Sequence, residues 1–207
     1  MKQIDTGGLS FPRLLENGDY YYVDKSLLIK DILDNNKQGI YLFTRPRRFG
    51  KTTNLSMLDA FFNIEYKGNT WFDGLAISEY PEYEQYKNAF PVIDINLKDT
   101  KSNSKEFFVE RLKYVLKKVF MEHRYLLKSD VLMDFEREFF DRVLREEVPE
   151  MKMLSCIPEL CEYLHRYHGN NVIILIDEYD RAVSDAFGEE SHREIMDFLG
   201  LFLSPIL

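Results

Sequence analysis

The chain has 207 residues, of which 45% are hydrophobic and 30% charged, an ordinary composition for a globular protein with one sizeable core. No stretch approaches the roughly 20 uninterrupted apolar residues of a membrane-spanning helix, so the sequence argues against a membrane protein. Its 27 Lys and Arg against 35 Asp and Glu give a formal net charge of −8, which argues against a protein whose whole surface grips nucleic acid.

The cysteines and the N-terminus predict a reducing, cytoplasmic setting. Cys156 and Cys161 are too few to form a disulfide framework. The first residues, Met1 to Asp5, lack the charged-then-apolar layout of a secretory signal. No internal repeat or low-complexity tract is visible, and glycine and proline are scattered, so we expect a single domain over residues 1–207.

The first elements are short. Gly7 to Asp19 is rich in turn-forming residues, and Tyr20 to Val23 has the aromatic and β-branched character of an extended segment. Asp24 or Ser26 is expected to cap a helix over Leu27 to Asn35, where leucine and isoleucine recur at helical spacing.

A strand, a loop and a helix are predicted next. Ile40 to Phe43 is a continuous apolar run, the expected form of a strand buried on both faces of a parallel sheet. After Gly50, one apolar face predicts a helix that begins at this glycine. The residues of that face are Leu55, Leu58, Phe61 and Phe62.

The second half alternates strands and helices. Pro91 to Leu97 and Val172 to Ile176 predict strands. Helices are expected over Phe107 to Arg124, with Leu112, Val115, Leu116 and Val119 inward, over Asp130 to Glu147 and over Pro158 to His168. This alternation predicts an α/β fold, a three-layer αβα arrangement with a mostly parallel sheet.

The loop before the third helix is close to a phosphate-binding P-loop. That pattern has two glycines flanking four residues, then Lys and Ser or Thr, because backbone amides must point at the phosphates. Arg45 stands where the first glycine would be, whereas Gly50, Lys51 and Thr52 fill the later positions. Lys51 is expected to reach the outer phosphates and to act in catalysis, and the Thr52 hydroxyl to ligate Mg²⁺. The predicted nucleotide-binding residues are Arg45, Pro46, Arg47, Arg48, Phe49, Gly50, Lys51, Thr52 and Thr53.

The basic residues of this loop have two interpretations. Arg45, Arg47, Arg48 and Lys51 gather positive charge in an otherwise acidic chain. They form either a solvated basic loop before an amphipathic helix or a site for an anion. The preceding apolar run and the acidic motif that follows a later strand favour the anion.

A carboxylate pair ends the last predicted strand. Asp177 and Glu178 directly follow the apolar run, at the strand edge where open α/β sheets bind ligands. Asp177 is expected to hold Mg²⁺, directly or through water, and Glu178 to orient or deprotonate the attacking water. Without the basic loop, these carboxylates would fit a catalytic pair and a merely polar strand end equally well.

Other charged residues stay unassigned. Arg181 either makes a structural salt bridge or touches a nucleotide, in its own or a neighbouring subunit's site. Asp24, Lys25 and Asp94 are candidates without a role.

A zinc site is the alternative chemistry. Cys161, His165 and His168 share one face of a predicted helix, and Cys156 lies just upstream. One rigid helix cannot readily wrap three ligands tetrahedrally around a metal, and no Cys-x-x-Cys pair is present, so the sequence disfavours zinc.

Three motifs together closely resemble the bacterial AAA-ATPase-like family, and the similarity spans nearly the whole chain. They are Tyr22 to Ser26, Arg45 to Thr52 and Asp177 to Asp180. The loop of that family reads Arg-Pro-Arg-Arg-Phe-Gly-Lys-Ser/Thr, so Arg45 follows family usage. The resemblance implies ATP and Mg²⁺ as ligands, with Lys51 and Thr52 as nucleotide and magnesium residues and Asp177 and Glu178 as the Walker B pair.

The resemblance also bears on the domain layout. It implies an N-terminal segment over residues 1–36 and a nucleotide-binding core over residues 37–207. Family members typically continue into a region resembling PD-(D/E)XK nucleases, which this sequence does not contain. In related ATPases a further strand with a polar sensor residue inserts between the P-loop strand and the Asp177 strand. We therefore expect the fold to be incomplete at the C-terminus.

The leading functional hypothesis is a magnesium-dependent ATPase module whose hydrolysis switches a conformation or a partner. The alternative is a nucleotide-responsive binding module without turnover. A small-molecule kinase also uses a P-loop, but the Asp-Glu pair favours water as the acceptor. ATP is the expected ligand. The sequence leaves open whether the chain forms a homo-oligomer or binds another protein. Nucleic acid is a candidate partner by family analogy alone.

Overall fold

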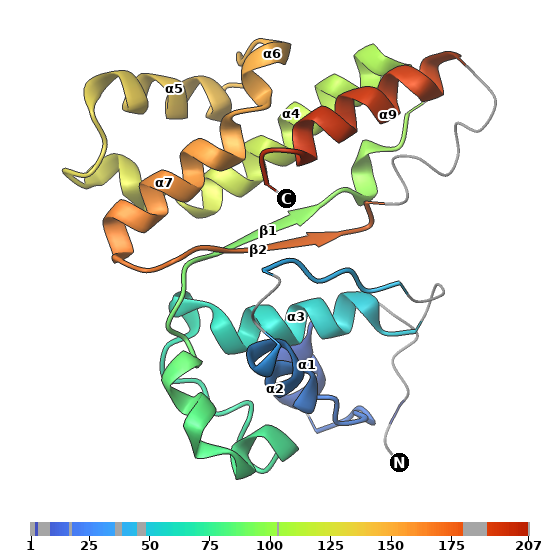
Figure 1. Ribbon diagram of the computed structural model, residues 1–207, viewed down its shortest axis with the longest axis vertical. Helices are drawn as coiled ribbons and strands as arrows, with labels where there is room; N and C mark the ends of the chain where they lie inside the picture. The colour runs from blue at the N-terminus through green and yellow to red at the C-terminus, as the bar shows by residue number, and fades with distance from the viewer. Residues whose placement is uncertain are drawn as a thin grey trace. The chain divides into compact units, whose positions relative to one another are not determined.

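The computed structural model contains two compact units, Met1–Val92 and Ile93–Leu207, and each is described by itself. Figure 1 shows the chain with its elements labelled. The single domain expected from the sequence stays a prediction. The described residues are 3, 9–16, 18–35, 39–44, 49–102, 104–179 and 190–206.

The first unit is built around an aromatic cluster. The Phe72 ring lies 5.0 Å from the Phe11 ring and 5.2 Å from the Phe61 ring, between centroids. All three side chains are buried, so they form the core of this unit. The helical elements of the unit are α1 (Phe11–Glu16), α2 (Leu27–Asp34), α3 (Lys51–Phe62) and the 3₁₀ segments η1 (Ile64–Tyr66), η2 (Ala76–Glu79) and η3 (Pro81–Tyr86).

Helix α1 departs from the turn-rich segment expected over Gly7 to Asp19. Phe11 and Leu14 are buried one helical turn apart, and α1 packs against α3. The backbone N–H of Phe11 donates to the Ser56 hydroxyl on α3 at 3.0 Å. Tertiary packing therefore stabilises a six-residue helix that is too short to form alone.

The C-terminus of α3 is capped by Asn88, a residue far from it in the sequence. The Asn88 side-chain amide donates to the carbonyls of Ala60 at 3.1 Å, Phe61 at 3.2 Å and Asn63 at 2.9 Å. Asn88 is buried and has a φ of 51°, a left-handed conformation that asparagine tolerates better than most residues. These bonds satisfy carbonyls that the end of a helix leaves without intrahelical partners.

The prediction of a buried strand over residues 40–43 is wrong. These residues form no strand, and Ile40 and Leu42 are 49% and 68% exposed. Tyr41 and Phe43 are half-buried, and the Tyr41 hydroxyl donates to the Ile32 carbonyl at 2.8 Å. A strand needs a ladder of hydrogen bonds to a neighbour. Among the described residues before β1, bridges occur only as isolated pairs, Gln3 with Tyr20 and Asn63 with Phe90.

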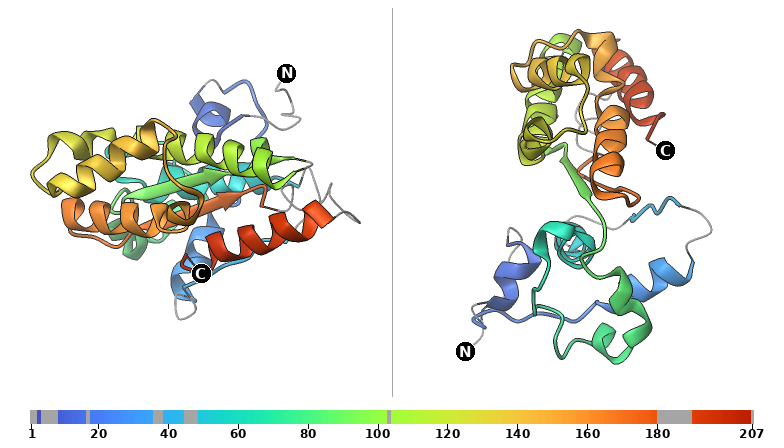
Figure 2. Two further views of the ribbon diagram at one scale, coloured as in Figure 1. Left: turned by 90° about the horizontal axis from the view of Figure 1, so that it is seen from above. Right: turned by 90° about the vertical axis from the view of Figure 1, so that its left-hand side faces the viewer.

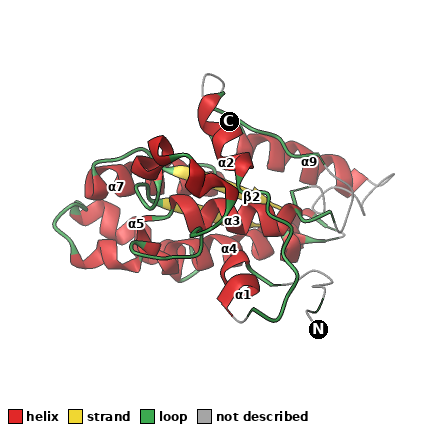
Figure 3. Cartoon of the chain, turned by 90° about the horizontal axis from the view of Figure 1, so that it is seen from below, coloured by secondary structure: helices red, strands yellow, loops and turns green. Residues whose placement is uncertain are grey.

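The second unit contains the sheet. Strands β1 (Val92–Asn96) and β2 (Ile173–Asp177) run parallel and pair directly, as the direction of their arrows shows (Figure 1). Among the described residues this two-stranded sheet accompanies mostly helical structure (Figure 3). The mixed α/β class is confirmed. The helical elements of the unit are η4 (Lys98–Thr100), α4 (Lys105–Glu122), η5 (Arg124–Lys128), α5 (Asp134–Leu144), α6 (Glu150–Met153), α7 (Cys156–His168) and α9 (Glu190–Leu203).

The core of this unit lies between the strands and the helices. Helices α4, α5, α7 and α9 gather on one side of the sheet (Figures 1 and 2). Ile93 and Ile95 of β1 point into this core, whereas Asp94 and Asn96 are exposed on the other face. The α4 residues predicted to point inward, Leu112, Val115, Leu116 and Val119, are all buried in it.

The predicted helices and strands of this half are confirmed, with ends that differ by a few residues. The largest difference is α5, which covers Asp134–Leu144 where a helix over Asp130 to Glu147 is expected. Helix α9, with Phe198 and Phe202 buried, has no counterpart among the predicted elements. No helix of the described residues is both long and apolar enough to cross a bilayer.

His123, which follows α4, is a buried group with no hydrogen-bond partner for either ring nitrogen. Burial, with a smaller effect of His168, lowers the pKa of His123 from 6.5 to about 4. Between pH 6.5 and about 4, His123 is therefore protonated in the unfolded chain but neutral in the folded chain. We expect this residue to reduce the free energy of unfolding by about 3 kcal/mol as pH falls from 6.5 to about 4.

Urea denaturation at a series of pH values checks this expectation in the wild type and in His123→Leu. The variant should lose stability less steeply in this range. Equal slopes in His123→Leu and the wild type would contradict the prediction.

Candidate functional site

The first group of predicted site residues lies at the start of α3. Gly50 is the N-cap residue, with φ 75° and ψ 23°, and its carbonyl accepts from the Asn54 N–H at 2.9 Å. This left-handed conformation is readily available only to glycine. It turns the chain so that the helix begins directly at Lys51. The backbone amides and the positive dipole end of a helix N-terminus favour an anion at this position.

The other predicted loop residues lie around this turn. Lys51 and Thr53 are half-buried, Thr52 is exposed, and the Phe49 side chain is 59% exposed. The helix start predicted at Gly50 is confirmed, while the nucleotide contacts stay predictions. Arg45, Pro46, Arg47 and Arg48 lie outside the described residues.

Asp24 and Ser26 stabilise the chain just before α2. Ser26, one of the two residues expected to cap α2, occupies the N-cap position, but its hydroxyl accepts from the Ile77 N–H at 3.1 Å and not from its own helix. The Asp24 carboxylate accepts from the Ser26 N–H at 2.8 Å and the Ala76 N–H at 2.7 Å. Burial by itself would raise the pKa of Asp24, but these hydrogen bonds hold it below its usual value. Asp24 thus has a structural role.

The second group of predicted site residues lies at the end of β2. Asp177 is buried at 6% exposure, and its Oδ1 accepts from the backbone N–H of Glu178 at 2.9 Å. Its carbonyl accepts from the Leu97 N–H at 3.0 Å, so β1 and β2 end at the same edge of the sheet. The strand therefore delivers the carboxylate to its carboxyl end, as the sequence predicts.

Glu178 has a strained backbone, with a φ of 57°. A residue with a Cβ atom pays roughly 1–2 kcal/mol for the left-handed region. Strain of this kind is concentrated at functional sites, where the side chain must point in a direction that regular structure forbids. The chain turns at Glu178 immediately after the buried Asp177.

A family comparison decides the assignment. The sequence profile of a family described as "Predicted AAA-ATPase" matches residues 6–207. The chain belongs to the AAA-ATPase-like family. It is also 25% identical over 207 residues to a protein of Azotobacter chroococcum mcd 1, "Uncharacterized protein in vnfD 5'region". The alignment covers 99% of this chain and 34% of that relative, so the chain spans about a third of the relative's length. No solved structure matches.

The AAA-ATPase-like motifs fall into two local groups. Gly50, Lys51 and Thr52 lie together in the first unit, and Asp177 and Glu178 lie together in the second. A further residue, Lys25, lies beside Gly50, where the sequence assigns it no role. The signal that could have found it is its place in the first of the three family motifs.

The side chains considered for zinc are engaged elsewhere. His165 Nδ1 hydrogen-bonds the Asn170 carbonyl at 2.9 Å, and His168 Nε2 the Tyr125 hydroxyl at 2.8 Å. Burial raises the pKa of Cys156 to about 12, and that of Cys161 to about 11. In the described part of the chain, no three His, Cys, Asp or Glu side chains are grouped to hold a metal ion.

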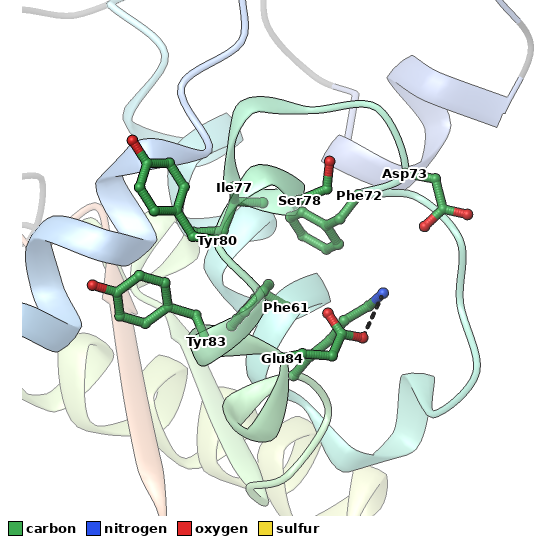
Figure 4. Close-up of a pocket in the computed structure, with 9 residues that line it drawn as sticks. Phe61, Phe72, Asp73, Ile77, Ser78, Tyr80, Tyr83 and Glu84 are labelled. Carbon is green, nitrogen blue, oxygen red and sulfur yellow. Dashed lines mark ion pairs between the residues drawn. The ribbon is translucent and has the colours of Figure 1, made fainter.

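The first unit also contains a hollow on its surface (Figure 4). It is lined by aromatic side chains, among them Tyr80 and Tyr83, and by an ion pair in which Lys87 Nζ lies 3.4 Å from Glu84 Oε1. None of its lining residues belongs to the predicted nucleotide site.

Proposed function

We propose that this chain is an ATP-binding, magnesium-dependent P-loop ATPase module. The observation that carries the proposal is Gly50, whose left-handed conformation begins α3 and puts Lys51 and Thr52 in its first turn. Membership of the AAA-ATPase-like family supports ATP as the nucleotide. The three-layer αβα arrangement and the nucleotide-binding core over residues 37–207 are part of this proposal.

The phosphates would bind at the start of α3. The backbone amides of its first turn are the donors, and Lys51 supplies a cation to the outer phosphates. Arg45, Pro46, Arg47, Arg48, Phe49 and Thr53 complete the proposed phosphate loop.

The oxygen ligands for magnesium fit the chemistry of that ion. Mg²⁺ prefers hydroxyl and carboxylate oxygens, and it is usually held by one or two carboxylates together with substrate phosphates. Thr52 offers an exposed hydroxyl, and Asp177 a buried carboxylate at a strand end. When bound, the ion would neutralise charge that develops on the phosphates. Glu178 would hold the attacking water and accept its proton.

Hydrolysis would then switch a conformation of the protein or its contact with a partner, which is either another copy of the chain or a different protein. Arg181, for which a structural salt bridge and a contact with a nucleotide both stay predictions, lies outside the described residues.

ATP titration with and without Mg²⁺, in the wild type and in Lys51→Ala, tests the proposal. We expect the variant to lose about 10- to 100-fold in ATP affinity, because a hydrogen bond from a charged group contributes about 1.5–3 kcal/mol. Isothermal titration calorimetry gives both dissociation constants.

Lys67→Ala is the matched control. Lys67 is an exposed lysine of the same unit, outside the proposed loop, so its replacement removes one positive charge without touching the site. It should bind ATP as the wild type does. Unchanged ATP affinity in Lys51→Ala would contradict the proposal.

A further inference from the structure

Lys25 is close to the turn that begins α3. A Cβ atom placed on Gly50 would lie 3.3 Å from Lys25 Nζ, which is tighter than an ordinary van der Waals contact. Glycine at position 50 therefore serves two needs: it adopts the left-handed φ of 75°, and it lets an ammonium group approach the backbone of the turn. The two residues lie far apart in the sequence, so only the tertiary fold brings them together.

The backbone of Lys25 is held by its neighbours. Its N–H donates to the Tyr22 hydroxyl at 3.4 Å, and that hydroxyl donates to Met57 Sδ on α3 at 3.3 Å. The Tyr22 ring also packs edge-on against Phe11, with centroids 5.4 Å apart. These contacts connect the residue to the helix whose N-terminus it approaches.

The residues on both sides of Lys25 are fixed as well. The Asp24 carboxylate accepts two backbone N–H bonds, and the fully buried Ser26 accepts one from Ile77. Asp24 is therefore occupied with backbone donors. Among the salt bridges within the described residues, none involves Lys25.

The position of Lys25 favours a bound anion. The N-terminus of a helix carries positive partial charge, which repels a nearby cation such as the Lys25 ammonium. An anion bound at this helix end is attracted both by the ammonium and by the positive end of the helix dipole.

We infer that Lys25 is a second phosphate-binding lysine of this site, one that contacts a phosphate oxygen of the bound nucleotide beside Gly50. The inference rests on the proposed function and adds a ligand-contacting residue to it. The contact is to phosphate and not to the base, because Lys25 lies at the phosphate-binding end of α3.

ATP and GTP titrations of Lys25→Ala, Lys25→Arg, Lys51→Ala and Lys67→Ala test the inference. Lys25→Ala should lower the affinity for each nucleotide about 10-fold, by the same factor for both because the base is not involved. Lys25→Arg should restore most of the affinity, since it keeps the positive charge. The loss should shrink at high salt, because the side chain is exposed and its charge is screened.

Lys25→Ala should unfold at the temperature of the wild type, because its exposed side chain packs in no core, and this separates binding from folding. Three outcomes would overturn the inference: affinity equal to that of Lys67→Ala, no rescue by Lys25→Arg, or a loss confined to one base. If one of these outcomes is found but Lys51→Ala weakens ATP binding, the inference about Lys25 is wrong and the proposed function still holds. If Lys51→Ala binds ATP as the wild type does, the proposed function fails first, and the inference with it.

Discussion

Glu178→Gln should lower the rate of phosphate release from ATP by on the order of 10²–10⁴-fold while leaving ATP affinity unchanged. Glutamine has the shape of glutamate but cannot accept the proton of the attacking water. The substitution leaves the backbone N–H of residue 178 in place, so its bond to Asp177 Oδ1 persists. The φ of 57° costs glutamine about as much as glutamate, and folding should not change. Steady-state phosphate release at saturating ATP and Mg²⁺ measures the effect.

Glu146→Gln is a matched control for this experiment. Glu146 has a similar left-handed φ of 61°, and its carboxylate pairs with Lys117 Nζ at 2.6 Å. The same chemical change at the same backbone conformation should leave hydrolysis intact. Equal rates in Glu178→Gln and the wild type would remove Glu178 from the mechanism. ATP binding by the wild type without phosphate release would favour the binding module without turnover.

Phe140→Ala should reduce the free energy of unfolding of the second unit by about 3–5 kcal/mol. The Phe140 side chain on α5 is fully buried, and its ring packs edge-on against Phe120 of α4 with centroids 4.7 Å apart. Truncation removes this buried surface and leaves a cavity between two helices that form much of the core. Urea denaturation followed by far-UV circular dichroism gives the difference between variant and wild type.

Phe135→Ala is the control on the same helix. The Phe135 side chain is 66% exposed, so its removal should cost well under 1 kcal/mol. The pair of variants separates the packing of α5 from its intrinsic helix propensity, because both replace phenylalanine with alanine on one helix. Similar losses in the two would show that Phe140 is not a core residue.

The helices and strands that were predicted well are those with long apolar periodicity. Helix α4 shows this best, because four of its residues recur on one face and all four are buried. The ends are less well predicted: α5 begins at Asp134, where Glu136 bonds the Met133 N–H. The end of a helix depends on a single such contact, whereas its interior repeats the same pattern several times.

Two errors have a common cause. Residues 40–43 have the composition of a strand but lack a ladder, and Phe11–Glu16 lies within the turn-rich segment Gly7 to Asp19 but folds as a helix against α3. In both segments the local signal is short. Packing and hydrogen bonding with distant residues then decide the conformation.

The sequence by itself determined the helix that starts at Gly50, the strand that ends at Asp177 and the family whose motifs these are. These features depend on residues within one or two turns of each other, and local hydrogen bonds and periodicity encode them. The tertiary structure alone decided the conformation of Phe11–Glu16 and residues 40–43, and it alone placed the ammonium group of Lys25 beside Gly50. Such contacts join segments far apart in the chain, and their free energy comes from burial and hydrogen bonds that exist only once the chain has folded.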